Sequence, residues 1–251
     1  MLNSIKIKCI NTVLILISCL LINVVSANES KSNSNLSTRT ESDLIRDKTS
    51  KPYQIAEFAG VKSDENVLDL FGGGGYYSEI LAQAVGKNGS VTLHNNQAYL
   101  PYVGVELQVR LSDKRLKNVT KLMSEAKDLK LGNSQYDLVV LVLGYHDFFY
   151  SADKWHVTAD KVMPQLLKAL KSKGRLLVID HNASVGAGAS KAQALHRIEA
   201  VFAKKDIQSR GFTFLKESSL LRNSVDPLDI KVFDPKIRRK TDRFVYLFSK
   251  P

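Results

Sequence analysis

A run of four glycines constrains the fold of this chain more than any other feature: Gly72, Gly73, Gly74 and Gly75. A short apolar segment, Asn66–Leu70, precedes the run, and a helical pattern of apolar residues follows it from about Ile80. This order predicts a strand, a tight turn and a helix. Glycine suits such a turn because the chain must reverse with positive φ and because a Cβ would keep a ligand away from the backbone. The stretch therefore indicates a nucleotide-cofactor turn rather than a flexible surface loop.

Two kinds of cofactor site use a glycine turn of this type. A nicotinamide site places its first glycine directly after the strand, and here Phe71 stands at that position. The first motif of class I methyltransferases that use S-adenosyl-L-methionine (SAM) has an acidic residue at the strand end, followed by Gly-x-Gly-x-Gly. Asp69, Gly73 and Gly75 fit that motif, with Phe71 in place of the first glycine. We therefore favour SAM, and a nicotinamide oxidoreductase is the disfavoured alternative.

The first 27 residues have the pattern of a secretory signal peptide. Lys6 and Lys8 precede a mostly apolar run over residues 10–25, and small residues lead to Ala27. This order predicts export, to the periplasm or beyond, with cleavage after Ala27. The run is short for spanning a bilayer, which disfavours an uncleaved anchor. Lipid attachment is a weaker alternative, because Cys19 ends a segment that resembles a bacterial lipobox but the residues after it stay apolar.

Removal of this segment changes the cysteine content and the charge of the chain. Both cysteines, Cys9 and Cys19, lie within it, which excludes disulfides, thiol catalysis and cysteine-bound metal in the mature protein. Without Lys6 and Lys8 the chain keeps 34 basic and 25 acidic residues, a formal net charge of +9. The basic residues are scattered, without a stripe or interleaved aromatic residues. We therefore expect no nucleic-acid partner, and contact with a membrane only through the signal segment.

The remainder divides into a linker and one domain. Residues 28–50 are rich in Ser, Asn, Thr, Lys and Glu, which predicts a disordered polar linker. Residues 51–251 suit a single domain with one core.

Strand-like and helix-like apolar patterns alternate in that domain. The clearest strand, 136–143, is apolar without interruption, which indicates burial on both faces. The last two strands have no convincing helix between them, so they should form an antiparallel pair at the sheet edge. The pattern predicts an α/β three-layer sandwich with a Rossmann-like, mostly parallel sheet. We expect strands at 66–70, 90–94, 119–123, 136–143, 175–180, 212–216 and 243–248, and helices near 55–59, 80–85, 100–111, 159–172 and 195–202.

Ligands of such sheets bind beyond the carboxyl ends of the strands. Asn95 follows the second strand and can accept hydrogen bonds from ribose hydroxyls through its carbonyl oxygen. Glu125 follows the third strand and is placed to accept from an adenine amino group. The candidate cofactor-binding residues are Asp69, Gly72, Gly73, Gly74, Gly75, Tyr76, Asn95, Glu125 and Tyr145.

Two histidines follow the strongest strands and are the candidate proton-transfer groups. We expect His146 to act as a base or to orient the methyl acceptor, with Asp147 assisting and His181 across the cleft. The alternative is that these side chains only hold the loops closed by hydrogen bonds. No group of His, Asp and Glu has convincing metal-ligand spacing, so no metal is expected.

From about Arg46 to Pro251 the chain resembles the exported, predicted class I SAM-dependent methyltransferases, a largely uncharacterised bacterial family. The resemblance implies a seven-stranded sheet with an antiparallel last strand, and SAM at the glycine turn. Members of this family resemble the chain in lacking the first glycine and the usual ribose-binding acid. The segments that carry the resemblance are Val67–Glu79, Tyr136–Asp147, Leu176–Asn182, Leu195–Leu221, Val232–Pro235 and Lys240–Val245.

The function expected from these observations is methyl transfer from SAM to a small molecule or an envelope component. A second hypothesis is a non-catalytic protein that binds a nucleoside or another small ligand on the same fold. An export signal combined with a cytosolic cofactor motivates it, as do Phe71 and Asn95 at positions where a SAM site has glycine and an acid.

Overall fold

The computed structural model describes residues 39–152 and 154–251, and Thr40–Pro251 form one compact unit. The predicted signal segment lies outside the described residues. None of the helices within the described part is long and apolar enough to cross a membrane. The elements, with 3₁₀ helices written η, are α1 (Glu41–Ser50), α2 (Pro52–Phe58), β1 (Asn66–Leu70), α3 (Tyr76–Val85), β2 (Ser90–Asn95), η2 (Gln97–Tyr99), α4 (Leu100–Leu111), η3 (Ser112–Lys114), β3 (Val119–Met123), β4 (Tyr136–Val142), η4 (His146–Phe149), α5 (Ala159–Ala169), β5 (Leu170–His181), α6 (Ala192–Leu195), α7 (Ala200–Ser209), β6 (Thr213–Ser218) and β7 (Arg243–Ser249).

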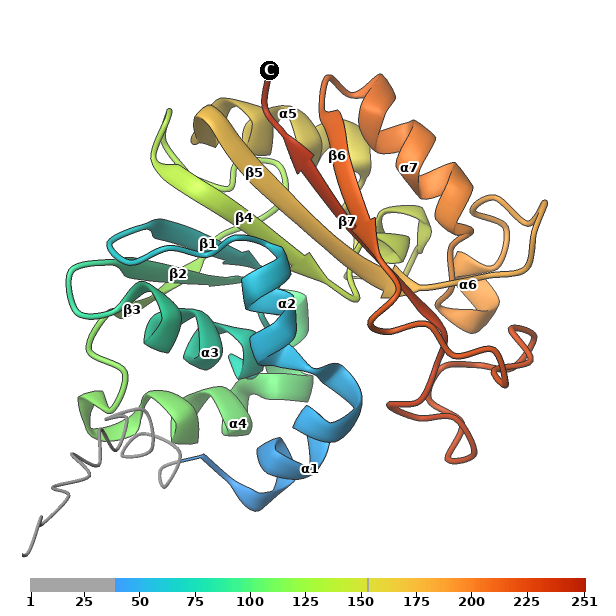
Figure 1. The fold of residues 1–251 in the computed structure, drawn as a ribbon, viewed down its shortest axis with the longest axis horizontal. Helices are drawn as coiled ribbons and strands as arrows, with labels where there is room; N and C mark the ends of the chain where they lie inside the picture. Colours follow the sequence, from blue (N-terminus) through green and yellow to red (C-terminus); the bar gives the residue numbers. More distant parts are fainter. Residues whose placement is uncertain (1–38, 153) are drawn as a thin grey trace, which may run out of the picture. The chain divides into compact units, whose positions relative to one another are not determined.

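The strands form one seven-stranded sheet in the order β3-β2-β1-β4-β5-β7-β6 (Figure 1). β1 to β5 are parallel, whereas β7 is antiparallel to both β5 and β6. This confirms the predicted mostly parallel sheet with an antiparallel last strand. The strand order reverses at β1, which has β2 on one side and β4 on the other. The carboxyl end of β1 therefore lies at the switch point where ligands of open α/β sheets bind.

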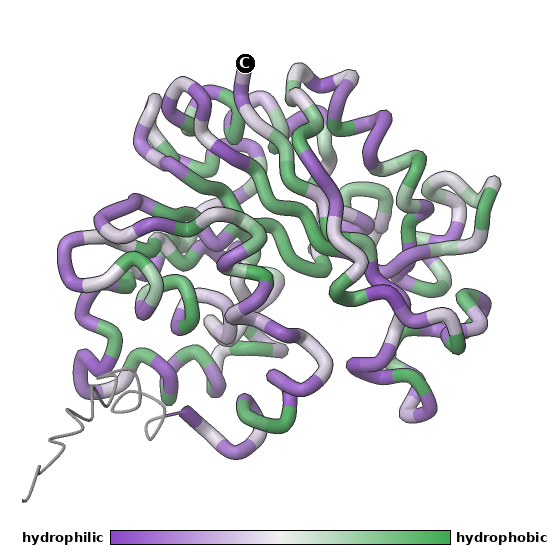
Figure 2. Tube along the Cα trace, in the orientation of Figure 1, coloured by the Kyte–Doolittle hydropathy of each residue, from purple (hydrophilic) through white to green (hydrophobic). Residues whose placement is uncertain are grey.

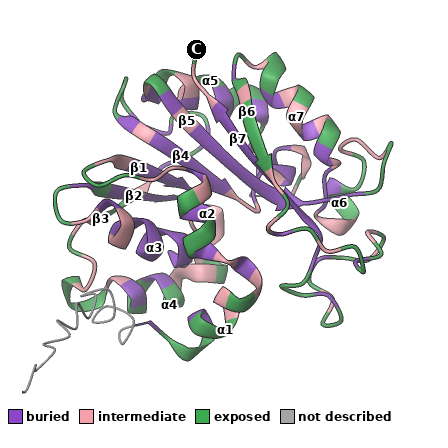
Figure 3. Ribbon diagram, in the orientation of Figure 1, coloured by how far each residue is buried: buried purple, intermediate pink, exposed green. Residues whose placement is uncertain are grey.

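Alternate residues of the central strands face two separate layers of helices. Leu68 and Val139 pack with α5 and α7 on one face, whereas Val67 and Leu138 pack with α2 and α3 on the other. The apolar strands therefore run between two helical layers (Figure 2). Burial follows the same pattern: β4, β5 and β7 are buried, and the edge strand β6 is largely exposed (Figure 3). Burial on both faces explains the uninterrupted apolar sequences of the central strands.

The prediction of a disordered linker over residues 28–50 is wrong for its last part, because α1 occupies Glu41–Ser50. Thr40 caps this helix, since its hydroxyl accepts a hydrogen bond from the backbone N–H of Asp43 (3.2 Å). Long-range contacts hold the helix in place: Arg110 binds Asp43, and Arg243 donates to the carbonyl of Thr49. These contacts join polar residues that are distant in sequence. The polar composition of the segment therefore predicted disorder, because the partners that order it cannot be recognised locally. Residues 28–38 lie outside the described part.

Two further boundaries differ from prediction. The helix expected over 159–172 ends at Ala169, and β5 begins at once with Leu170. The single helix expected over 195–202 is two helices, α6 and α7, separated by an extended segment in which Ile198 pairs with Asn182. Arg197 in this segment is fully buried and paired with Asp226 at 2.9 Å. The spacing of apolar residues around Ile198 is typical of a helix. The backbone is extended there because Ile198 pairs with Asn182 and Arg197 pairs with Asp226.

Candidate functional site

The glycine turn connects β1 to the first turn of α3, as predicted. Phe71, Gly73 and Gly75 have φ values of 53°, 59° and 81°, so the turn uses the left-handed region repeatedly. A Cβ at Gly72 would lie 2.7 Å from the Asp69 carboxylate, and one at Gly75 would lie 2.8 Å from Leu93. Glycine is therefore required at these two positions by the packing of the protein itself. Helix α3 begins at Tyr76, directly after the turn and earlier than its apolar pattern suggested.

Asp69 and Asn95 support the turn from below. Asp69 is fully buried and accepts a hydrogen bond from the Ser78 hydroxyl (2.6 Å); burial raises the pKa of its carboxyl to about 6, although this hydrogen bond opposes the rise. The Asn95 side chain accepts from the N–H of Gly73 and donates to the carbonyl of Gly73, both at 2.9 Å. Asn95 therefore fixes the conformation of the turn. The oxygen expected to accept from ribose thus accepts from Gly73 and keeps one further lone pair.

Arg110 of α4 binds the glycine turn and connects it to two neighbouring helices. Its Nε donates to the carbonyl of Gly74 (2.6 Å), and its guanidinium binds Asp43 of α1 (2.8 Å) and Glu79 of α3 (2.5 Å). The side chain is 3 % exposed, so this ion-pair network is buried. The exposed Glu106 adds a third carboxylate at 2.8 Å. One guanidinium thus joins α1, α3, α4 and the glycine turn, which lie together in Figure 1.

Tyr76 belongs to this helical contact and not to a cofactor wall. Its hydroxyl donates to Asp47 of α1 (2.5 Å), and the Arg46 guanidinium lies 3.8 Å from the centre of its ring. The ring is buried against α1. The expectation that Tyr76 lines the cofactor site is therefore not matched, because the first turn of α3 is covered by a helix that the sequence did not predict.

The orphaned polar group next to the turn is Asn96. Its side chain is 1 % exposed, and neither its amide nitrogen nor its carbonyl oxygen has a hydrogen-bond partner. Buried carboxamides in native proteins are normally hydrogen-bonded, and an orphaned one requires an explanation such as a ligand or a water molecule. Asn96, one residue beyond the predicted Asn95, is thus the better candidate for contacting hydroxyl groups of a cofactor.

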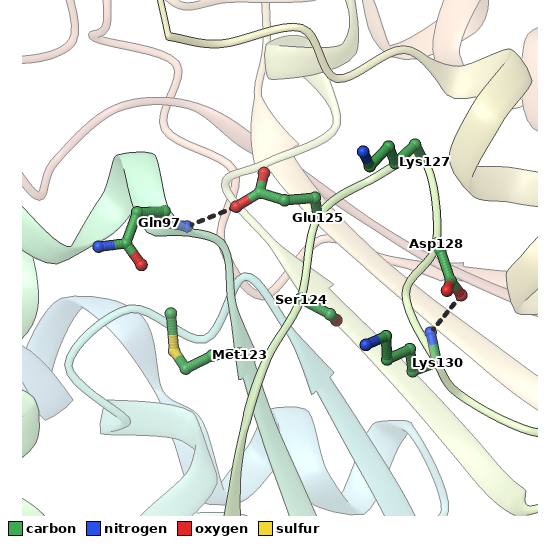
Figure 4. Close-up of a pocket in the computed structure, with 7 residues that line it drawn as sticks. All are labelled: Gln97, Met123, Ser124, Glu125, Lys127, Asp128 and Lys130. Atoms are coloured by element: carbon green, nitrogen blue, oxygen red, sulfur yellow. Dashed lines mark hydrogen bonds between the residues drawn. The ribbon is translucent and has the colours of Figure 1, made fainter.

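A pocket of about 370 Å³ opens at the carboxyl ends of β2 and β3 (Figure 4). Glu125 lines it, as does Gln97, whose backbone N–H donates to the Glu125 carboxylate (3.1 Å). This hydrogen bond leaves carboxylate acceptor capacity at the pocket. The pocket size falls within the range of small-molecule sites. The structure thus brings Glu125 to a cavity at the carboxyl ends of the strands, although the residues that line it do not include the glycine turn.

Phe71 lies at the centre of an aromatic cluster between the turn and β4. Its ring stacks on Tyr99 (centroids 5.8 Å apart) and contacts Trp155 (5.5 Å) and His94 (5.1 Å). The same cluster holds Asp147: Tyr99 donates its hydroxyl to the carboxylate (3.1 Å), and Trp155 donates its indole N–H to the backbone carbonyl (2.7 Å). The residue that replaces the first motif glycine therefore connects the turn to the predicted catalytic residues.

His146 and Asp147 follow β4, as predicted, and Asp180 at the end of β5 organises them. The buried Asp180 carboxylate accepts from the backbone N–H and the ring Nδ1 of His146, at 2.7 and 2.8 Å, and from the backbone N–H of His181 at 2.7 Å. Burial opposes a charge on His146, but Asp180 and Asp147 outweigh it and raise its pKa to about 10. The ion pair with His146 also keeps the pKa of Asp147 low, against the effect of burial.

These values change the expected roles of the two predicted histidines. With a pKa near 10, His146 is charged at neutral pH and acts as a hydrogen-bond donor and not as a base. Burial and the charge on His146 keep the pKa of His181 well below its usual value, so this ring is neutral. Its Nδ1 is 2.7 Å from the Thr241 hydroxyl, and its ring centre is 6.0 Å from that of His146. Of the two rings only the neutral His181 has a lone pair that can accept a proton, and its low pKa makes it a weak base.

Tyr145 points away from this group. Its hydroxyl donates to Asp206 of α7 (2.5 Å), and its ring is fully buried in the core. The expectation that it contacts the cofactor is not matched, because it anchors η4 to α7. Aromatic residues at strand ends commonly have such core roles.

Sequence reasoning missed His196, which completes the histidine group. Its Nδ1 lies 3.2 Å from Nε2 of His146 and 3.7 Å from Oδ1 of Asp147. The ring packs against Tyr150 and Phe233. His196 ends α6 in a left-handed conformation, within the segment that was expected to be helical. No pattern in the sequence marked His196, because its position depends on the burial of Arg197 in the fold.

The site thus has two adjoining parts. One part contains the glycine turn, Asn96 and the Glu125 pocket, and the other contains His146, Asp147, His181 and His196, with the Phe71 cluster between them. The first part can hold a nucleoside, because it offers hydrogen-bonding side chains and a pocket at the carboxyl ends of the strands. The second part offers charged donors and a neutral imidazole to a second molecule.

Solved structures with the same architecture are methyltransferase-fold proteins. A SAM-dependent methyltransferase from Aquifex aeolicus superposes with a TM-score of 0.59 at 17 % identity, over 82 % of this chain and 93 % of that one. The [4+2]-cyclase SpnF also gives a TM-score of 0.59, at 15 % identity, over 83 % of this chain and 81 % of its own. At these identities the similarity establishes the fold alone, and the two proteins are named for different reactions.

Sequence comparison places the chain more narrowly. The model of the ubiE/COQ5 methyltransferase family matches residues 25–218, and the chain belongs to this family. The ubiquinone/menaquinone biosynthesis C-methyltransferase of Pseudomonas paraeruginosa is 29 % identical over 137 residues, which are 54 % of this chain and 49 % of that enzyme. The corresponding Legionella pneumophila (strain Corby) enzyme is 29 % identical over 139 residues, 55 % of this chain and 51 % of its own. The chain thus matches about half the length of these relatives.

Proposed function

We propose that this protein is a SAM-dependent methyltransferase that acts on a small molecule. The observation that carries the proposal is the glycine turn of a ubiE/COQ5-family chain, with the orphaned Asn96 and the Glu125 pocket beside it. C-methyltransferase activity belongs to the relatives by name, and the Aquifex aeolicus protein of the same fold is named SAM-dependent. The residues above are the reason to extend SAM-dependent methyl transfer to this chain. The quinone-biosynthesis reaction of the relatives is not extended, because the match covers only half of their length.

The residues of the first part fit a nucleoside cofactor. Gly73 is half-buried and carries no side chain, whereas Gly74 is buried against Glu106. Asn96 can donate to and accept from ribose hydroxyls, and Glu125 can accept from the adenine amino group. When bound, SAM supplies a methyl group activated on a sulfonium. Phe71 and Tyr99 exclude water from the space between the turn and Asp147. His146 orients an acceptor by donating a hydrogen bond, and the neutral His181 takes a proton where the acceptor loses one.

A matched pair of variants in the pocket tests this assignment. Glu125→Gln removes the carboxylate expected to bind the adenine amino group, and we expect SAM to bind about tenfold or more weakly, since hydrogen bonds to charged groups contribute about 1.5–3 kcal/mol. Asp128→Asn is the control, because Asp128 lines the same pocket but accepts from the Lys130 N–H (3.1 Å). Titration calorimetry measures both affinities. Equal weakening by the two variants would argue against adenine at Glu125.

A non-catalytic ligand-binding protein is the second candidate. The observation that favours it is Phe71, because its ring fills space where the class I motif has glycine and packs among Tyr99, Trp155 and His94. Binding of SAM without methyl transfer to any member of a broad acceptor panel, quinols and phenols included, would support this candidate over the enzyme.

We also propose that the protein is exported and that its first 27 residues are removed. The support is the basic start, apolar centre and small residues before Asn28. We expect the intact mass of protein recovered from the periplasm or medium to correspond to a chain that begins at Asn28. A mass that includes residues 1–27, or a lipid on Cys19, would contradict this proposal.

A further inference from the structure

We propose that His146, Asp147 and His196 form a binding site for a single divalent transition-metal ion such as Zn²⁺. Three possible ligand atoms converge there: Nε2 of His146, Oδ1 of Asp147 and Nδ1 of His196. The group lies at the carboxyl end of the sheet, outside the expected SAM pocket. The proposal goes beyond methyl transfer and does not depend on SAM binding.

The separations of the three atoms match a metal site. His146 Nε2 is 3.1 Å from Asp147 Oδ1 and 3.2 Å from His196 Nδ1, and the remaining pair is 3.7 Å apart. In a tetrahedral zinc site, bonds of about 2.0–2.1 Å separate the ligand atoms by about 3.3 Å. One ion can therefore contact all three atoms after shifts of a few tenths of an ångström. Hydrogen bonds link the same three groups when no ion is bound, so an ion would take the place of the protons that they share.

The surrounding hydrogen bonds orient two of the three side chains as metal ligands. Asp180 accepts from Nδ1 of His146 (2.8 Å), which fixes a hydrogen on Nδ1 and points Nε2 at the site. Without an ion, Nε2 carries the second proton of the charged ring, and a bound ion would displace that proton and take its place. Histidine ligands in proteins almost always make such a bond to a carboxylate or carbonyl through their other nitrogen. Asp147 is held similarly, because the Tyr99 hydroxyl donates to Oδ2 (3.1 Å) and leaves Oδ1 facing the histidines.

The donor set and its burial indicate the class of metal. Two imidazoles and one carboxylate suit Zn²⁺ and neighbouring ions, whereas Mg²⁺ and Ca²⁺ prefer oxygen ligands. The side chains are only 4 %, 14 % and 14 % exposed for His146, Asp147 and His196. Three protein ligands leave a fourth tetrahedral position for water or for an atom of a bound molecule, as in catalytic zinc sites. His196 is 49 residues beyond Asp147, so ligand spacing in the sequence did not reveal the site.

The test is titration of the chelator-treated, untagged full chain with Zn²⁺ and Co²⁺. For this titration both cysteines are replaced, by Cys9→Ser and Cys19→Ser, so that their thiolates do not bind the metal. We expect one ion per chain and, with Co²⁺, the intense visible bands of tetrahedral coordination. His196→Ala should weaken Zn²⁺ binding by more than the roughly 10–100-fold that loss of a supporting hydrogen bond costs. His156→Ala is the matched control, because His156 is exposed and outside the group, and it should bind Zn²⁺ like the parent.

Two results would overturn the proposal. One is a folded parent chain that takes up no stoichiometric ion, and the other is equal Zn²⁺ affinity in the parent and in His196→Ala. Circular dichroism establishes that each variant is folded. If His196→Ala fails to fold, the Co²⁺ spectrum of the parent decides, because octahedral bands of weak intensity would exclude the three-ligand tetrahedral site.

Discussion

Arg110→Ala is expected to lower the free energy of unfolding by about 3–5 kcal/mol, because it removes one partner from a buried ion-pair network. The Arg110 guanidinium is 3 % exposed and binds Asp43 and Glu79, whose side chains are 4 % and 0 % exposed. Its loss removes the cation that the two carboxylates share, and among the described residues Glu79 keeps only its ion pair with Arg115. It also removes the donor to the Gly74 carbonyl, so the glycine turn should loosen and α1 should separate from α4. Urea unfolding measures the change.

Glu106→Ala is the matched control for this prediction. Glu106 binds the same guanidinium, but its side chain is 53 % exposed and lies four residues away on the same helix. Exposed pairs of this kind contribute about 0.3–0.5 kcal/mol. We therefore expect Glu106→Ala to unfold close to the parent. Similar losses for the two variants would show that the buried carboxylates do not depend on Arg110.

The second large effect is a loss of stability on acidification caused by His94. Burial lowers the pKa of His94 to about 4, against 6.5 in an exposed histidine, although its hydrogen bond to the Ser124 carbonyl opposes the shift. That bond, at 3.1 Å, places the ring hydrogen on Nε2, and Nδ1 is buried without a partner. The folded state therefore binds fewer protons than the unfolded state between pH 4 and 6.5. This contribution to stability is complete above pH 6.5 and falls by about 3 kcal/mol as the pH drops to 4.

Asp69 changes the free energy of unfolding in the opposite direction over part of the same pH range. The effect of His94 must therefore be measured as a difference between two proteins. Burial raises its pKa from 3.8 to about 6, so the folded state holds a proton there and gains stability as the pH falls from 6 to 3.8. His94→Gln keeps a donor for the Ser124 carbonyl but does not titrate. Subtracting the unfolding free energies of His94→Gln from those of the parent isolates His94. The difference should fall by about 3 kcal/mol from pH 7 to pH 4, and parallel curves would contradict it.

The sequence was most informative where local pattern and burial agree. The central strands are apolar without interruption because both faces are covered, so β1 and β4 were located closely. The glycine turn was recognisable because its backbone needs positive φ at Gly73 and Gly75. The positions of Glu125, His146 and His181 followed from the rule that parallel strands deliver their next residues to one edge of the sheet.

The sequence was least informative where distant polar residues determine the structure. Helix α1 is mostly polar, and its order depends on Arg110 and Arg243, which are 67 and 194 residues from their partners. His196 reaches His146 because Arg197 and Ile198 are buried in an extended segment with a helix-like apolar pattern. Asn95 and Asn96 are adjacent and chemically identical. Only the fold decides that one supports the turn and the other is left for a ligand.

The measurement that tests the central proposal most directly is calorimetric titration of the folded protein with SAM and S-adenosylhomocysteine. We predict saturable binding of both ligands at one site per chain, and no binding of NADH under the same conditions. A folded protein that binds neither SAM nor S-adenosylhomocysteine would contradict the account.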